Sequence, residues 1–166
     1  MPTDEGTALV IDLAVWTVAG LSVGFAHHRL PTTRLRKDGS LTRIRGWERD
    51  GGWYQCTFRI RTWKDLLPDA GAFFRGGLSK RSLPSPDCGG LERFAVETRR
   101  AERVHWCLLS LGPVFWLWNP PALAMVMTAY AVIANVPFIM VQRFNRARVL
   151  RILRRRAASV GASPLH

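Results

Sequence analysis

The chain has 166 residues, a formal net charge of +12, and 48% hydrophobic residues. This length leaves room for one domain with an ordinary core and excludes a second domain of usual size. Residues 1–26 and 104–142 contain no Lys or Arg, so all 24 basic residues fall in two blocks. This uneven distribution, rather than the average composition, predicts the class of protein.

The first block without basic residues contains an apolar run over residues 8–26. About 19 residues make roughly 28 Å of helix, close to the ~30 Å hydrocarbon core of a bilayer. The run follows the acidic residues Asp4 and Glu5 and precedes a basic block, which favours a retained transmembrane anchor over a cleaved signal peptide. Asp12 lies near the start of this run, and we expect it to snorkel toward the outer interface.

The second block, residues 104–141, is too long for one membrane span and is interrupted at Asn119-Pro120-Pro121. Proline removes a backbone donor and disfavours helix at the preceding residue, so a helical hairpin of two further spans is predicted. Asn135 and Pro137 lie deep in the last of these spans. We expect Asn135 to find a partner on a neighbouring helix or at the carbonyl that Pro137 frees.

The basic blocks predict the topology. We expect residues 1–166 to form a single membrane domain, with a first span at 8–26, a basic cytoplasmic region at 27–103, a hairpin at 104–141 and a basic cytoplasmic tail at 142–166. The positive-inside rule then places the N-terminus outside in a multi-pass cell-membrane protein. Attraction to anionic membrane lipid, worth ~1 kcal/mol per basic residue near the surface, explains the net charge. No nucleic-acid partner is needed.

A short β-hairpin is predicted within the basic region. Residues 53–61, WYQCTFRIR, alternate between apolar and polar side chains, and Asp50-Gly51-Gly52 before them is typical of a turn that pairs them with residues 44–47. Residues 76–90 are rich in Gly, Ser and Pro and predict a loop. The expected fold class is therefore mainly α, a small integral membrane protein with about three transmembrane helices and this hairpin.

Neither a disulfide framework nor a metal site is predicted. The three cysteines show no CxxC spacing, and one of the four histidines is the C-terminal residue. We therefore expect no metal and no cofactor.

The helix that leads into the second apolar block places Glu97, Glu102 and His105 on one arc and its arginines on the other. A carboxylate beside an imidazole is what general-base catalysis on an alcohol requires, because the carboxylate orients the ring and stabilises the imidazolium. The alternative is a His105-Trp106 pair that anchors the helix at the interface, with solvated carboxylates. The residues leave both interpretations open.

A second group of candidates follows the last span. Arg143, Arg146 and Arg148 could hold the phosphates of an acyl donor, such as an acyl thioester of coenzyme A. Asn145 among them is not explained by membrane anchoring. The alternative is a polybasic anchor on anionic lipid, and for residues 154–156 that alternative is favoured.

Three phrases of the sequence carry a family resemblance: FRIRTWKD (Phe58–Asp65), ETRRAERVHW (Glu97–Trp106) and YAVIANVPFIMVQRFNRAR (Tyr130–Arg148). The chain resembles the glycosyl-4,4'-diaponeurosporenoate acyltransferases of staphyloxanthin-type carotenoid biosynthesis, from about residue 47 to residue 156. The resemblance implies transfer of a fatty acyl group to the glucose 6-hydroxyl of a membrane-dissolved carotenoid glycoside. The implied partners are membrane lipid, the glycoside and an acyl donor.

The chemistry of the residues completes this hypothesis. His105, oriented by Glu102 or Glu97, would deprotonate the sugar hydroxyl, and Asn145 or an indole N–H such as that of Trp106 would stabilise the oxyanion. A covalent acyl-Cys107 intermediate is an alternative mechanism. Two alternative functions remain, an acyltransferase on another glycolipid and a non-catalytic membrane scaffold of a lipid pathway.

Overall fold

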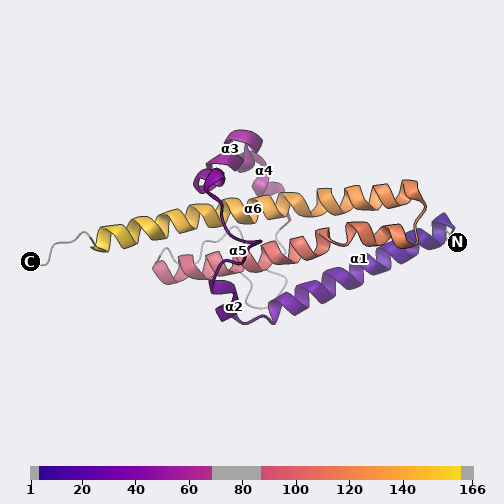
Figure 1. The fold of residues 1–166 in the computed structure, drawn as a ribbon, viewed down its shortest axis with the longest axis horizontal. Helices are drawn as coiled ribbons and strands as arrows, with labels where there is room; N and C mark the ends of the chain where they lie inside the picture. The colour runs from indigo at the N-terminus through magenta and orange to yellow at the C-terminus, as the bar shows by residue number, and fades with distance from the viewer. Residues whose placement is uncertain (1–3, 69–86, 162–166) are drawn as a thin grey trace, which may run out of the picture. The chain divides into compact units, whose positions relative to one another are not determined.

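The computed structural model describes residues 4–68 and 87–161, and in these residues all regular structure is helical. The chain divides into two compact units, one of Met1–Leu30 and Glu102–Ile139 (the first unit) and one of Pro31–Ala101 and Met140–His166 (the second unit). The elements, of which Figure 1 labels the α-helices, are in order α1 (Glu5–His28), α2 (Thr32–Arg36), η1 (Gly46–Gly51), α3 (Gly52–Phe58), α4 (Ile60–Trp63), η2 (Lys64–Leu66), α5 (Cys88–Leu109), η4 (Gly112–Leu117) and α6 (Pro121–Gly161).

The first unit contains α1, the end of α5, η4 and the first part of α6. Asp4 caps α1, because its Oδ1 accepts a hydrogen bond from the Thr7 backbone N–H (3.0 Å) and its Oδ2 accepts one from the Thr7 hydroxyl (2.6 Å). These bonds lower the pKa of the Asp4 carboxyl, and the bond from the Thr7 hydroxyl has the largest effect. Helix α6 begins at Pro121, where the missing N–H of proline costs no helical hydrogen bond.

The prediction of three transmembrane helices is wrong. Among the described residues, two helices are long and apolar enough to cross a membrane, over Gly6–His28 and Pro121–Ser159. The expected middle span is instead divided, because α5 ends at Leu109 and a 3₁₀ helix with Pro113 in its first turn follows. Proline cannot continue the α-helical hydrogen bonds of the preceding turn, and 3₁₀ helices stay short. Apolar composition alone did not reveal this division.

The surface of the first unit is apolar. Only 11% of the most apolar stretch of α1 is buried, so α1 is not a core helix of a water-soluble domain. Its exposed side chains include large apolar ones, and the same holds for the first half of α6. These exposed residues include Leu9, Val10, Leu13, Leu21, Met125, Val126, Val132 and Ile133. Such a surface suits lipid rather than water.

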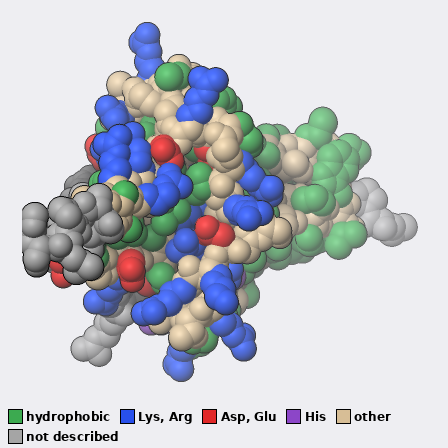
Figure 2. Space-filling view, turned by 60° about the vertical axis from the view of Figure 1, so that its left-hand side comes forward, with side chains coloured by type: hydrophobic (Ala, Val, Ile, Leu, Met, Phe, Trp, Pro, Cys, Tyr) green, Lys and Arg blue, Asp and Glu red, His purple; other side chains and the backbone are tan. Residues whose placement is uncertain are grey.

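The second unit is built around the second part of α6. On one side, Val141 and Phe144 pack with Tyr54 of α3 and Ile60 of α4. A separate cluster joins α6 to the first half of α5 through Leu91, Phe94, Ala95 and Val149. Blue Lys and Arg side chains project from much of the face seen in Figure 2, with red acidic side chains among them.

The predicted β-hairpin is wrong as well. Residues 53–61 form α3 and the start of α4, which are separated by Arg59 in the left-handed conformation (φ 48°). Of the alternating apolar residues, Tyr54 and Ile60 are buried, but Cys56 and Phe58 are exposed, so the alternation does not describe one buried face. Of the predicted loop at 76–90, residues 76–86 lie outside the described part of the chain. The rest of it is mostly helical, since α5 begins at Cys88.

Candidate active site

His105 of α5 and Asn135 of α6 form a polar pair in the first unit. The Nδ1 atom of His105 lies 3.0 Å from Oδ1 of Asn135. The Asn135 side chain is buried, and its Nδ2 donates to the Ala131 carbonyl (2.8 Å). Because the amide N–H is used in this way, Oδ1 is the acceptor and Nδ1 of His105 carries the proton. In the neutral ring, Nε2 is then the basic nitrogen.

The plane of the His105 ring is set by a second contact. The ring stacks on Phe138, with 4.6 Å between the centroids and 16° between the planes. Asn135 and Phe138 lie three residues apart on α6 and therefore on one face of it. The two residues orient an imidazole that is itself half-buried. This is the arrangement a general base needs, because its position and its tautomer are both determined.

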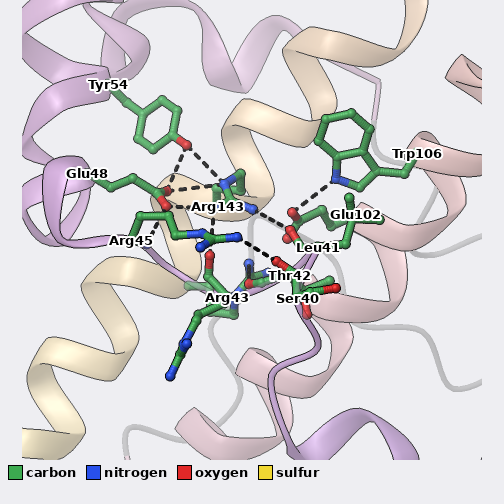
Figure 3. Close-up of polar contacts among 11 residues, drawn as sticks. Ser40, Leu41, Thr42, Arg43, Arg45, Glu48, Tyr54, Glu102, Trp106 and Arg143 are labelled. Carbon is green, nitrogen blue, oxygen red and sulfur yellow. Dashed lines mark hydrogen bonds and ion pairs between the residues drawn. The ribbon is translucent and has the colours of Figure 1, made fainter.

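The predicted carboxylates have partners of their own. Glu102 is fully buried, and its Oε1 accepts a hydrogen bond from the indole N–H of Trp106 at 3.2 Å (Figure 3). Glu97 belongs to the second unit, where its Oε2 lies 3.2 Å from Nε of Arg100. The predicted contributions of Glu97, Glu102 and Trp106 to catalysis remain predictions, while Asn135 is a partner of His105 that the sequence did not assign.

Arg143 lies in a buried network of the second unit (Figure 3). Its guanidinium donates to both oxygens of Glu48, at 2.6 and 3.2 Å, and to the Tyr54 hydroxyl oxygen at 3.1 Å. Glu48 also accepts from the Tyr54 hydroxyl (2.8 Å) and from the Arg45 backbone N–H (2.6 Å). Burial, followed by the contact with Glu48, raises the pKa of Tyr54 above its ordinary value.

Arg143 and Arg146 also hold the backbone that precedes this network. Arg143 donates to the carbonyls of Leu41 (3.0 Å) and Arg43 (2.8 Å), and Arg146 donates to the carbonyl of Thr42 (2.5 Å). Three consecutive carbonyls are therefore bound by two arginines of α6. The structure gives these arginines a role in fixing the segment, and their predicted binding of the acyl donor remains a prediction.

The other two predicted substrate-binding residues of α6 are more accessible. Asn145 and Arg148 are half-buried, and the Arg148 guanidinium lies over the Phe144 ring, 5.4 Å from its centroid. Binding of the donor by Arg148 and stabilisation of the oxyanion by Asn145 remain predictions. No local pattern in the sequence pointed to Glu48 and Tyr54, because Arg143 lies about ninety residues further along the chain.

Asp12 does not snorkel. Its side chain is fully buried in the first unit, where Oδ1 accepts from the indole N–H of Trp118 (2.8 Å) and from the Asn119 amide (2.9 Å). The Asn119-Pro120-Pro121 turn was predicted from its prolines alone, but its asparagine also binds α1. This contact stabilises the packing of η4 against α1, because burying a carboxylate requires hydrogen-bond donors.

Metal binding finds no support among the residues that the structure describes, because no group of three or more His, Cys, Asp or Glu side chains in them could hold an ion. The three cysteines, Cys56, Cys88 and Cys107, are free thiols on the surface.

Comparison with known proteins identifies the class. The family model described as glycosyl-4,4'-diaponeurosporenoate acyltransferase matches residues 37–155. A relative of that name from Staphylococcus haemolyticus (strain JCSC1435) is 35% identical over 141 residues, which cover 84% of this chain and 81% of the relative. Another from Staphylococcus aureus (strain bovine RF122 / ET3-1) is 33% identical over 145 residues, covering 85% of this chain and 87% of the relative. No solved structure matches.

The protein is thus an acyltransferase. More specifically, the chain belongs to the glycosyl-4,4'-diaponeurosporenoate acyltransferase family, and the family resemblance seen in the sequence is confirmed.

Proposed function

We propose that the protein transfers a fatty acyl group from an acyl thioester to a sugar hydroxyl of a carotenoid glycoside, with His105 as the general base. The names of the relatives support this acceptor class. The observation that carries the catalytic assignment is the hydrogen bond between His105 and Asn135, supported by the stacking on Phe138. Together these contacts direct Nε2 to serve as the proton acceptor.

The proposed reaction is a direct transfer. Nε2 of His105 removes the proton of the sugar hydroxyl while the hydroxyl oxygen attacks the thioester carbonyl carbon. The tetrahedral intermediate collapses, the carbon–sulfur bond breaks, and the leaving thiolate takes the proton from the imidazolium. The products are an ester and a free thiol, and His105 returns to its neutral state. Asn135 keeps the ring in the same tautomer throughout, since its Oδ1 accepts from Nδ1 before and after the transfer.

A membrane location suits both substrates. The polyene of a carotenoid glycoside and the acyl chain prefer lipid, whereas the sugar remains at the level of the headgroups. We propose that α1 and the apolar part of α6 lie in the bilayer and that the end of α5 and η4 carry the chain back to the outer side between them. The N-terminus then lies outside, and the basic region and the C-terminal tail lie in the cytoplasm. The apolar surface of the first unit and the basic composition of the second support this topology.

Lipid mass spectrometry tests the function. Cells that make the carotenoid glycoside would express wild-type protein, His105→Ala, His28→Ala or no protein, with membrane levels of each protein measured. We expect the mass of one acyl chain to be added to the glycoside by wild type and by His28→Ala, which removes an exposed imidazole elsewhere in the first unit. His105→Ala should lower product at least about 100-fold, the usual contribution of general-base catalysis.

Each other outcome has a definite meaning. Equal product from His105→Ala and wild type would reject His105 as the base. No acylated glycoside with any variant, at normal membrane levels, would reject the carotenoid acceptor and direct attention to another glycolipid or to a scaffold role. Cys107→Ala should keep wild-type activity, and its inactivity would favour the covalent acyl-Cys107 mechanism instead.

A further inference from the structure

A groove of about 620 Å³ lies within the second unit, between α2, the first half of α5 and the C-terminal part of α6. Pockets for small molecules generally measure ~300–1,000 Å³, so the groove is large enough for a substantial part of a cofactor-sized ligand. It is separate from the His105–Asn135 pair, which belongs to the first unit. None of the residues predicted from the sequence to bind substrate lines it.

The lining of the groove combines apolar side chains with three arginines, beside Thr32, Gly89 and Glu92. Four side chains provide apolar surface, two from α5 and two from α6: Ala95, Val96, Leu150 and Leu153. Arg36 and Arg93 are exposed at the groove, and within the described part of the chain neither guanidinium has an ion-pair partner. Arg99, also in the lining, is buried and already paired with Asp38 at 2.6 Å. Two exposed cations thus stand beside an apolar surface.

We propose that this groove binds the phosphorylated arm of the acyl donor, with the phosphates of coenzyme A at Arg36 and Arg93 and the pantetheine arm along the apolar residues. The proposal rests on the proposed function in that the donor is an acyl thioester. Guanidinium groups bind phosphate through paired N–H donors. A free fatty acid offers only one carboxylate, whereas coenzyme A has several phosphates and a long, weakly polar arm, which matches this division of the lining.

The acidic residue of the lining limits where the phosphates can lie. Glu92 is exposed at the groove, one position before Arg93 on α5. Neighbouring residues on a helix point about 100° apart, so a phosphate can lie beside Arg93 without lying beside Glu92. Gly89, one turn earlier, has open space around the position of a Cβ atom. The groove therefore remains open beside the first turn of α5.

Calorimetry tests the proposal. It would measure the Kd of coenzyme A for the purified full-length protein in nanodiscs of zwitterionic lipid. The double variant Arg36→Gln/Arg93→Gln should weaken the Kd roughly tenfold to hundredfold, because two charge-assisted contacts are lost. The matched control is Arg155→Gln/Arg156→Gln, which removes the same charge from the exposed end of α6 and should leave the Kd unchanged.

A second variant tests the cavity rather than its charge. Gly89→Trp places an indole into the open space and should also weaken binding of coenzyme A, without changing the net charge. Pantetheine, which lacks phosphates, should bind wild type and the double arginine variant equally weakly. The proposal is overturned if both variants, folded by thermal unfolding, bind coenzyme A like wild type. It is equally overturned if the double variant loses only its binding to vesicles of anionic lipid, which would make the arginines a lipid contact.

The same measurements separate this proposal from the proposed function. Coenzyme A binding needs no acceptor, so a chain that binds coenzyme A through Arg36 and Arg93 but does not acylate a carotenoid glycoside would refute the acceptor alone. If both groove variants acylate the glycoside with the wild-type KM for the donor, the groove proposal is refuted and the proposed function stands.

Discussion

At the scale of single residues, the partner of His105 determines what the imidazole can do. Asn135 fixes the tautomer through a neutral amide, whereas a carboxylate would in addition stabilise the imidazolium by its charge. In the proposed reaction, a neutral partner would help the imidazolium return its proton to the leaving thiolate. The buried position of Asn135 also protects this hydrogen bond from competition by water.

Tyr54 carries a prediction about pH. Burial and the Glu48 contact raise its pKa, so the neutral phenol stabilises the fold fully below about pH 10, the usual tyrosine pKa, and this stabilisation is lost as pH rises beyond it. We expect the thermal stability of wild type to fall above about pH 10. Tyr54→Phe should be less stable at pH 8 by about 1 kcal/mol, the net worth of a hydrogen bond, but less sensitive to alkaline pH.

Thermal unfolding in detergent between pH 8 and pH 11 measures this difference. Tyr130, which lies half exposed on α6 in the first unit, supplies the control variant Tyr130→Phe, which should follow the wild-type pH dependence. Parallel stability curves for wild type and Tyr54→Phe would contradict the account of the buried network.

The sequence was informative about which residues are polar in apolar surroundings, but less so about their partners. His105 and Asn135 were each recognised as unusual, and a partner on a neighbouring helix was expected for Asn135. The pairing itself depends on how α5 and α6 align, and thirty positions separate the two residues. The same holds for Arg143 and Glu48, because contacts between distant residues leave no periodic pattern in one sequence.

At the scale of elements, the segment before α3 depends on a tight approach to α6. Gly51 has a φ of 89°, a conformation that glycine adopts readily and other residues rarely. A Cβ atom at this position would lie 3.2 Å from both the Phe144 ring and the Phe144 carbonyl oxygen. A methyl group at this position would therefore crowd Phe144, which would have to shift by a few tenths of an ångström.

We predict that Gly51→Ala destabilises the protein by about 1–3 kcal/mol, through backbone strain together with the contact with Phe144. Gly46→Ala is the matched control, since Gly46 has open space around its Cβ position and no positive φ. Chemical unfolding of both variants measures the difference. Equal stability of the two variants would show that the turn does not pack against α6 as described.

Helix starts and breaks were easier to predict than the type of each element. The prolines after Asn119 mark the start of α6, and Asp50-Gly51 does form a turn with positive φ angles. The residues from Trp53 to Arg61 nevertheless form two short helices. The left-handed residue between these helices changes which side chains face inward, so the apolar residues alternate in sequence without forming a strand. A period of two over nine residues does not exclude such a broken helix.

At the scale of the whole molecule, the predicted topology can be tested with the native thiols. Cys56 and Cys88 are exposed and belong to the second unit, which is proposed to be cytoplasmic. A membrane-impermeant maleimide should leave both unlabelled in intact cells and should label both after lysis. A tag added before Met1 should, in contrast, be accessible to antibody in intact cells. Labelling of Cys56 or Cys88 in intact cells would contradict the topology.

The distribution of charge predicted the two apolar helices but not the number of spans. Hydropathy sums side chains without regard to backbone geometry, so the apolar residues around Gly112 and Pro113 were assigned to a continuous helix. The buried Asp12, which accepts hydrogen bonds from Trp118 and Asn119, shows why this region packs against α1 instead.

The central claim is that Asn135 acts through His105 in the acyl transfer, and a double-mutant cycle on the reconstituted enzyme tests it most directly. Acylation rates would be measured at saturating glycoside and acyl thioester for wild type, His105→Ala, Asn135→Ala and the double variant. If Asn135 only positions His105, Asn135→Ala should be about 10- to 100-fold slower than wild type, and the double variant no slower than His105→Ala. Multiplied effects in the double variant, or a wild-type rate for His105→Ala, would contradict the claim.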